Sequence, residues 1–267
     1  MDKQMQRAAA DLLYGHWMQG TRLANLPEDL RPVTRSEGYA IQGLLEERSA
    51  MPLFGWKIAA TSAAGQAHIA VDGPLAGRIL SERVIPENGF CPFGNNLMKV
   101  AELEFAFRMG TTLEPRQTAF EVEEVLAKVT TLHPAIEVPD SRFEPFEKAG
   151  AAQLIADNAC GHYFVLGELA PEEWRELDLA AHPVAGYVNG VAVGEGFGRN
   201  VLGDPRLALH WLANELSRHN IPLRAGQVVT TGTCMTPLAI APGDLVSGDF
   251  GPIGNISIRF ERGLSGK

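Results

Sequence analysis

Two glutamates stand one residue apart in an otherwise apolar stretch, VAELEFAF, at residues 100–107. In a β-strand, residues i and i+2 point to the same face, so Glu102 and Glu104 share one face while the leucine and phenylalanines between and beyond them face the core. Two neighbouring like charges repel unless something neutralises them. Mg²⁺ and Mn²⁺ prefer oxygen ligands and would do so. The pair therefore indicates either a metal site or a solvated strand face.

A third carboxylate, Glu137, lies in a second apolar run, PAIEVPDSR, at residues 134–142. Ile136 and Val138 share one strand face, and Glu137 takes the other. Three carboxylates on strand faces would close one side of an octahedral site and leave positions for water and substrate. The sequence does not show that the two strands are neighbours.

A lysine, Lys57, occurs within the apolar strand-like run GWKIAATS at residues 55–62. Burial would depress the pKa of its ammonium and suit it to proton transfer. The alternative is that its stem packs in the strand while the ammonium reaches the surface.

Other polar motifs point less clearly to chemistry. Thr231-Gly232-Thr233 follows a predicted strand, where its N–H groups and hydroxyls would bind a substrate carboxylate, although a turn explains it equally well. The glycine-rich residues 194–198 lack the GxGxxG spacing of a dinucleotide site. The histidines form no HxH or HExxH pattern, and the three cysteines form no CxxC pair, so neither a zinc site nor a disulfide framework is predicted.

Composition excludes several classes of protein. The net charge of −9 disfavours binding to nucleic acid and to anionic membranes. No apolar stretch approaches the ~20 residues of a membrane span, and the N-terminus lacks the apolar core of a signal peptide. Few and widely spaced cysteines fit a reduced, cytoplasmic protein.

These candidate residues must be held by a strand-rich body. Hydrophobic spacing predicts helices over residues 2–19 and 36–50, and from Pro52 onward short β-type runs are broken by Gly, Pro and Asn. Asn189-Gly190 between two valine-rich runs predicts a tight hairpin. We therefore expect an α+β fold, with an N-terminal helical segment (1–52) packed on a largely antiparallel or mixed β body (53–267).

Two further helices are expected within this body, at about 120–128 and 205–219. The second begins at Asp204, a good N-cap, followed by Pro205 at the first helical position. Its predicted apolar stripe consists of Leu207, Trp211, Leu212 and Leu216.

Taken in order, several motifs resemble the 2-keto-4-pentenoate hydratase and 4-oxalocrotonate decarboxylase family of the fumarylacetoacetase superfamily. The resemblance runs from about residue 5 to 261. The motifs that carry it are GWKIAATS, VDGPLAG, AELEFAF, AIEVPDSRF, ADNACGHYFVLG, VNGVAVGEG, VLGDPRLALHWLANEL and AGQVVTTGTC, followed by a late PGD.

This resemblance implies a mixed β-roll core like that of the fumarylacetoacetase C-terminal domain. It implies Mg²⁺ or Mn²⁺ held by Glu102, Glu104 and Glu137, a chelating 2-oxo acid substrate, and proton transfer assisted by Lys57. The implied activity is hydration or decarboxylation through a cation-stabilised enolate, in the catabolism of aromatic compounds. Such proteins are usually homo-oligomers, and a complex with a paralogous lyase is a further expectation.

The chain departs from the family pattern around the substrate. Leu75 stands where many hydratases have an acid, and Asp72 is the candidate to replace that acid in proton transfer. The usual TSKAMQ reads TSAAGQ, which keeps Ser62 and Gln66 as candidate substrate contacts. Cys160 replaces the serine of Asp-Asn-Ala-Ser, and with Thr233 and Leu75 it completes the predicted substrate-binding set. The chain is thus interpreted as a divergent member.

Two other functions are weighed against this lyase. A C–C hydrolase of acylpyruvate or diketone type needs a histidine base, for which His68 is the near candidate. A non-catalytic partner subunit of an active paralogue is favoured by the leucine at position 75.

Overall fold

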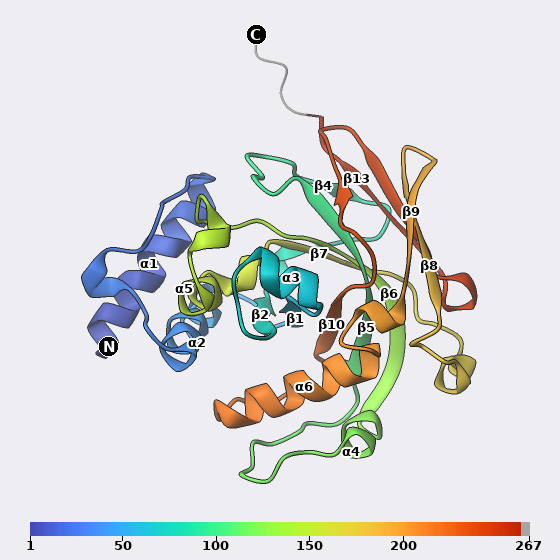
Figure 1. Ribbon diagram of the computed structural model, residues 1–267, viewed down its shortest axis with the longest axis horizontal. Helices are drawn as coiled ribbons and strands as arrows, with labels where there is room; N and C mark the ends of the chain where they lie inside the picture. The colour runs from blue at the N-terminus through green and yellow to red at the C-terminus, as the bar shows by residue number, and fades with distance from the viewer. Residues whose placement is uncertain (263–267) are drawn as a thin grey trace.

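The computed structural model describes residues 1–262, which form two mixed β-sheets flanked by helices (Figure 1). The six α-helices of this part of the chain are α1 (Lys3–Gln19), α2 (Arg35–Gly43), α3 (Ala63–His68), α4 (Val122–Leu126), α5 (Ala151–Ala156) and α6 (Pro205–Arg218). None of the helices in this range combines the length and the apolar character that crossing a bilayer requires.

The larger sheet has eight strands. Along it the order is β2-β1-β10-β5-β6-β7-β3, with β11 added to β5. Its strands are β1 (Gly55–Ala59), β2 (Leu75–Ile79), β3 (Val84–Ile85), β5 (Val100–Met109), β6 (Val129–Val138), β7 (Tyr163–Leu166), β10 (Val228–Thr233) and β11 (Leu238–Ala239). β10 pairs in parallel with β1 and antiparallel with β5, so a late segment of the chain lies at the centre of the sheet.

The second sheet has five strands in the order β4-β13-β12-β8-β9. These are β4 (Phe90–Cys91), β8 (Pro183–Val188), β9 (Val191–Phe197), β12 (Leu245–Asp249) and β13 (Asn255–Phe260). The predicted hairpin is confirmed, because Asn189 and Gly190 join β8 to β9 with φ of 53° and 79°, the positive values that a tight turn requires. The predicted α+β class and mixed sheet pairing are likewise confirmed.

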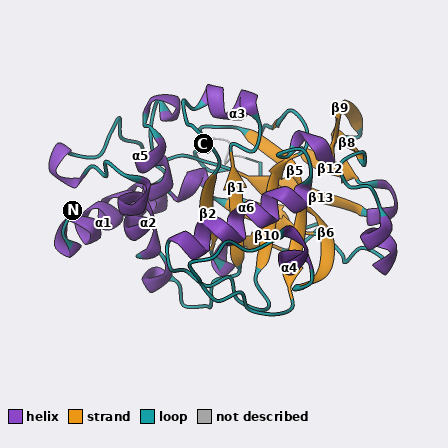
Figure 2. Cartoon of the chain, turned by 60° about the horizontal axis from the view of Figure 1, so that its bottom comes forward, coloured by secondary structure: helices purple, strands orange, loops and turns teal. Residues whose placement is uncertain are grey.

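Helices gather at one end of the molecule (Figure 2), where α1, α2 and α5 lie together. Ala9, Leu13 and Ile41 from α1 and α2 belong to the same buried cluster as Leu154 and Ile155 of α5. Apolar packing thus joins α5 to α1 and α2, which precede it by more than a hundred residues in the sequence. The division into residues 1–52 and 53–267 stays a prediction.

Several predicted helix details were wrong. The second helix starts after Thr34, whose side chain caps it together with Glu37, and it ends at Gly43, before a short 3₁₀ turn. In α6 the N-cap Asp204 is confirmed, and Leu212 and Leu216 are buried as predicted. Leu207, however, is 41% exposed, and Leu209 is buried in its place. The short helices α3 and α5 were not predicted, because runs of six residues show too little periodicity.

Candidate metal centre and adjoining cavity

The three predicted carboxylates come together on adjacent strands. β5 and β6 pair antiparallel, with Glu102 directly opposite Glu137, and Glu104 lies two residues further along the same face of β5. One carboxylate oxygen from each residue lies within 4.8 Å of the others. The opposite face of β5, with Leu103, Phe105 and Phe107, is fully buried in the core, as the alternation predicts.

Glu104 is held in place through one oxygen only. The Thr230 hydroxyl and the Gly232 N–H, the latter at 2.8 Å, both donate to Glu104 Oε2. Both donors come from β10 where its register with β5 shifts. Glu104 Oε1 is buried and has no hydrogen-bond partner among residues 1–262. The irregular strand therefore fixes the carboxylate and leaves one oxygen free to bind something else.

Lys57 closes the group from β1. Its side chain is 3% exposed, and Nζ lies 3.0 Å from Glu137 Oε1 and donates to the Ala159 carbonyl at 2.9 Å. Burial alone would lower the pKa of this ammonium, but the charges of Glu137 and Glu102 outweigh burial and raise it. The expectation of a depressed pKa was therefore wrong.

Among the described residues, Lys57 is the one cationic side chain beside the three carboxylates, so their negative charge is not fully neutralised. Burial, with the neighbouring Glu137 carboxylate, raises the pKa of Glu102 to about 7, although Lys57 partly offsets this. Burial likewise raises the pKa of Glu104 and of Glu137. Glu137 Oε2 and Glu104 Oε1 are buried without hydrogen-bond partners in the described chain. A buried carboxylate without a partner is unstable as an anion, so an all-oxygen donor set of this kind fits a hard divalent cation such as Mg²⁺ or Mn²⁺.

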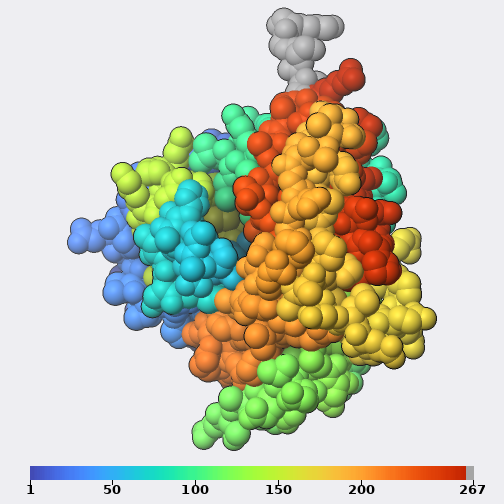
Figure 3. Space-filling model, turned by 45° about the vertical axis from the view of Figure 1, so that its right-hand side comes forward, coloured from blue at the N-terminus to red at the C-terminus, as the bar shows by residue number. Residues whose placement is uncertain are grey.

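A cavity of about 520 Å³ opens beside these groups and is lined by both Lys57 and Glu102. Its walls come from β1, from α3, from the segment around Phe146 and from the loop after β10. Figure 3 shows α3 (cyan) at the surface next to the yellow-green segment near residue 150. The cavity therefore gives a small molecule access to Glu102 and Lys57 from the outside.

Three predicted substrate contacts line this cavity: Ser62, Cys160 and Thr233. The Ser62 hydroxyl also caps α3 by accepting from Gly65 N at 3.0 Å. Burial raises the pKa of the Cys160 thiol to about 12, so it remains protonated and offers no thiolate nucleophile. The Thr233 hydroxyl donates to the Met235 carbonyl at 2.8 Å.

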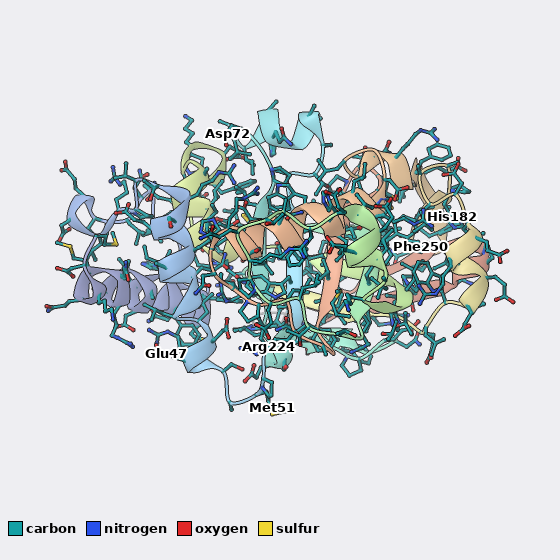
Figure 4. The ribbon with its side chains drawn as sticks, turned by 90° about the horizontal axis from the view of Figure 1, so that it is seen from below. Glu47, Met51, Asp72, His182, Arg224 and Phe250 are labelled. Atoms are coloured by element: carbon teal, nitrogen blue, oxygen red, sulfur yellow. The ribbon has the colours of Figure 1, made fainter. Side chains whose placement is uncertain are left out.

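Three other predicted site residues do not line the cavity. Asp72 lies on the surface near α3 (Figure 4), where its carboxylate is 87% exposed and pairs with Arg35. Leu75 is fully buried in the hydrophobic core. Gln66 donates to the Ala60 carbonyl at 3.1 Å and so braces α3 against the strand that precedes it. Asp72 is thus not placed to replace an acid at position 75, because its loop turns outward to solvent.

Sequence reasoning missed the groups that support the site. Thr230 follows a valine pair in a buried strand and looked like an ordinary strand residue. The Ala159 carbonyl reaches Lys57 because residues 158–160 all have positive φ, between 48° and 60°, which no sequence pattern announced. Met98 lines the cavity from a loop, and Phe146 lines it from a short 3₁₀ turn. The available signal was Gly232, which lies within β10 rather than in a turn after it and follows Thr230 by two residues, where the pairing with β5 becomes irregular.

His68, the candidate histidine base of a hydrolase, is not paired with a carboxylate in the described chain. Its ring lies 5.9 Å from that of Phe146, in an edge-on arrangement at the cavity wall. Among residues 1–262 no hydrogen bond joins His68 to a carboxylate. The geometry thus gives the hydrolase alternative no support.

Comparison with known proteins agrees with this fold and site. A 2-keto-4-pentenoate hydratase from Paraburkholderia xenovorans (strain LB400) is 30% identical over 264 residues, covering 98% of this chain and 97% of that protein. A 4-oxalocrotonate decarboxylase from Pseudomonas putida is 28% identical over 97% of this chain and 98% of its own length. The structure of 4-oxalocrotonate decarboxylase from Pseudomonas putida G7, complexed with magnesium and adipate, superposes with a TM-score of 0.88 at 26% identity, over 97% of this chain and 98% of that one.

The fold of that decarboxylase confirms the predicted β-roll type of core. The model of the fumarylacetoacetate (FAA) hydrolase C-terminal family matches residues 85–261. That range contains Glu102, Glu104, Glu137 and Thr233, and the full-length relatives extend the match to the segment with Lys57. This chain belongs to the FAA hydrolase C-terminal family.

Proposed function

We propose that the chain is a divalent-metal-dependent lyase that uses Mg²⁺ or Mn²⁺ to hydrate or decarboxylate a small 2-oxo acid. The observation that carries the proposal is the group of Glu102, Glu104 and Glu137, with unpartnered buried oxygens, beside a cavity that Glu102 and Lys57 line. The names of the relatives, a hydratase and a decarboxylase, support the same class of reaction.

The residues divide the work between binding and proton transfer. Glu102, Glu104 and Glu137 would hold the cation, which when bound would stabilise the negative charge that develops on a 2-oxo acid. Thr230 and Gly232 keep Glu104 from rotating. Preorganised ligands of this kind lower the reorganisation that the reaction requires.

Lys57 is the group placed to move a proton. Its ammonium lies between Glu137 and the Ala159 carbonyl and faces the cavity, so it can give a proton to a substrate carbon or oxygen and recover it. Cys160, with its protonated thiol, and Thr233 line the space that the substrate would occupy.

Ultraviolet assays test the proposal. The disappearance of 2-hydroxypenta-2,4-dienoate and of oxaloacetate is followed with purified protein in Mn²⁺ and in EDTA. Turnover of at least one of the two compounds in Mn²⁺, abolished by EDTA, is the expected result. Metal binding without turnover of any 2-oxo acid would favour the partner-subunit alternative, and cleavage of an acylpyruvate would favour the hydrolase.

The biological setting is proposed on the same basis. We infer a cytoplasmic enzyme of aromatic-compound catabolism that forms a homo-oligomer, with a paralogous lyase as a further partner. The hydratase and decarboxylase names of its relatives support the reaction class on which this setting is based. Light scattering of the purified protein, alone and mixed with the paralogue, measures both kinds of assembly.

A further inference from the structure

The residues that line the outer part of the cavity determine which tail of a 2-oxo acid can bind there. Beyond Lys57 and Glu102, its walls are mainly apolar, with Ile69, Met98 and Phe146 among them. A second cavity of about 480 Å³ adjoins the first, since both are lined by Met98, Phe146 and Glu102. A substrate whose head lies at the carboxylates would therefore extend its tail along this apolar surface.

Positive charge is absent from the outer cavity. All the residues lining the two cavities lie in the described part of the chain, and Lys57 is the single lysine among them, with no arginine. Lys57 lies at the inner end, where it pairs with Glu137. His68 is the one other side chain able to become a cation.

Negative charge is present there instead. Glu144 and Glu147 line the second cavity, on either side of Pro145 and Phe146. Glu144 is exposed and Glu147 is half-buried. A carboxylate at the far end of a substrate would meet these two acids without an arginine or lysine to pair with, which is unfavourable.

We propose that this enzyme selects 2-oxo acids with an uncharged, apolar tail and rejects those that carry a second carboxylate. The inference rests on the proposed function, because it assumes that the 2-oxo acid head lies at Glu102, Glu104 and Glu137. Repulsion by Glu144 and Glu147 supplies the discrimination, and the apolar wall supplies the affinity.

A matched pair of unreactive ligands tests the proposal. 2-Oxohexanoate and 2-oxoadipate have the same six-carbon chain and differ in a terminal methyl or carboxylate. Calorimetric titration into the Mn²⁺-loaded protein should show 2-oxohexanoate binding at least ~10-fold more tightly, the order expected for an unpaired charge near two partly screened acids. Equal or tighter binding of 2-oxoadipate would overturn the inference and leave the proposed function standing.

Charge reversal locates the effect. Glu147→Lys should tighten 2-oxoadipate binding about 10-fold while leaving 2-oxohexanoate within about twofold. Glu123→Lys makes the same change in net charge on exposed α4, which lines neither cavity, and should leave the ratio unchanged. Equal effects of the two variants would also overturn the inference.

Loss of binding by both ligands has a separate meaning. If the protein binds Mn²⁺ but neither 2-oxo acid, the assumed position of the head is wrong. The proposed function then fails, and the inference fails with it. The ratio of the two affinities therefore tests tail selection, and the presence of any Mn²⁺-dependent binding tests the function.

Discussion

The two oxygens of the Glu104 carboxylate have different surroundings, and its fixed oxygen is held by a hydroxyl and a backbone N–H. Oε2 accepts from Thr230 and Gly232, while Oε1 is buried without a partner in the described chain. An oxygen fixed by its neighbour and unsatisfied by the protein is well prepared as a ligand. A substitution of Glu104 is accordingly the most direct test of the metal assignment.

Glu104→Gln should weaken Mn²⁺ binding about 100-fold or more, since it removes an anionic ligand. The metal-free variant should keep its free energy of unfolding within about 1 kcal/mol, because the amide has the same shape and one of three crowded charges is gone. Mn²⁺ titration followed by electron paramagnetic resonance measures the first, and urea denaturation the second. Normal metal content in this variant would contradict the assignment.

Thr230→Val tests whether the support of Glu104 matters. The isosteric change removes the hydroxyl that donates to Glu104 and should weaken Mn²⁺ binding by about 10–100-fold. Thr231→Val is a matched control, because that buried hydroxyl donates instead to the Phe105 carbonyl. It should cost about 1 kcal/mol of stability with unchanged Mn²⁺ affinity, and equal losses in both variants would deny Thr230 a specific role.

Lys57→Met separates proton transfer from metal binding. Removing the ammonium should lower kcat by about 10²–10⁴-fold, the usual contribution of a general acid or base. Mn²⁺ should bind at least as tightly as in the parent protein, because a competing positive charge beside Glu137 has been removed. Loss of Mn²⁺ binding together with kcat would instead identify Lys57 as a structural residue.

At the scale of elements, β2 and the turn at residues 158–160 fit closely around Lys57. A Cβ added at Gly77 would lie 2.4 Å from the Asn158 carbonyl oxygen and 2.9 Å from Lys57 Cδ. Asn158 also bonds both the N–H and the carbonyl of Arg78, which fixes the turn to the strand. The position of the lysine thus depends on a backbone contact between two elements.

Gly77→Ala should therefore destabilise the protein by about 1–3 kcal/mol through overpacking and should also displace Lys57 and lower kcat. Gly15→Ala in α1 is the control, because nothing lies within 4 Å of its added Cβ. That change should be neutral or stabilising by about 0.5–1 kcal/mol. Thermal denaturation and the ultraviolet assay measure both effects, and a fully active, stable G77A protein would refute the close fit.

Alternation along strands made the carboxylate site predictable in part. Glu102 and Glu104 followed from the period of two, as did the buried face that includes Phe105. The register that sets Glu102 opposite Glu137 could not be predicted, because the sequence of one strand does not indicate which distant strand pairs with it. The same alternation marked Glu137 in its own run, and the resemblance to a family grouped it with the other two.

The short helices and loops around the cavity were harder to predict for a physical reason. α3 has six residues and no fully buried side chain, so no apolar stripe marks it. Asp72 was chosen from its distance in sequence to Leu75, but a loop can turn a side chain outward within three residues. Phe146 lies in a 3₁₀ turn that no periodicity indicates.

For the whole molecule, we expect bound metal to raise thermal stability. A ligand at 100 times its Kd adds about 2.7 kcal/mol, which for a chain of this size corresponds to a rise of roughly 5–10 °C in Tm. Differential scanning calorimetry in saturating Mn²⁺ and in EDTA measures the shift. Glu104→Gln should abolish it, and an equal shift in that variant would assign the stabilisation to another site.

The central position of β10 has a consequence for synthesis on the ribosome. β10 fills the gap between β1 and β5, which are encoded much earlier, and it brings the Thr230 hydroxyl and Gly232 N–H to Glu104. Until that segment leaves the exit tunnel, β1 and β5 each have an unpaired strand edge. Such edges can pair with other nascent chains and promote aggregation. The enzyme therefore acquires its ion-binding centre as one of the last events of its production, and fragments ending before residue 228 should emerge without it.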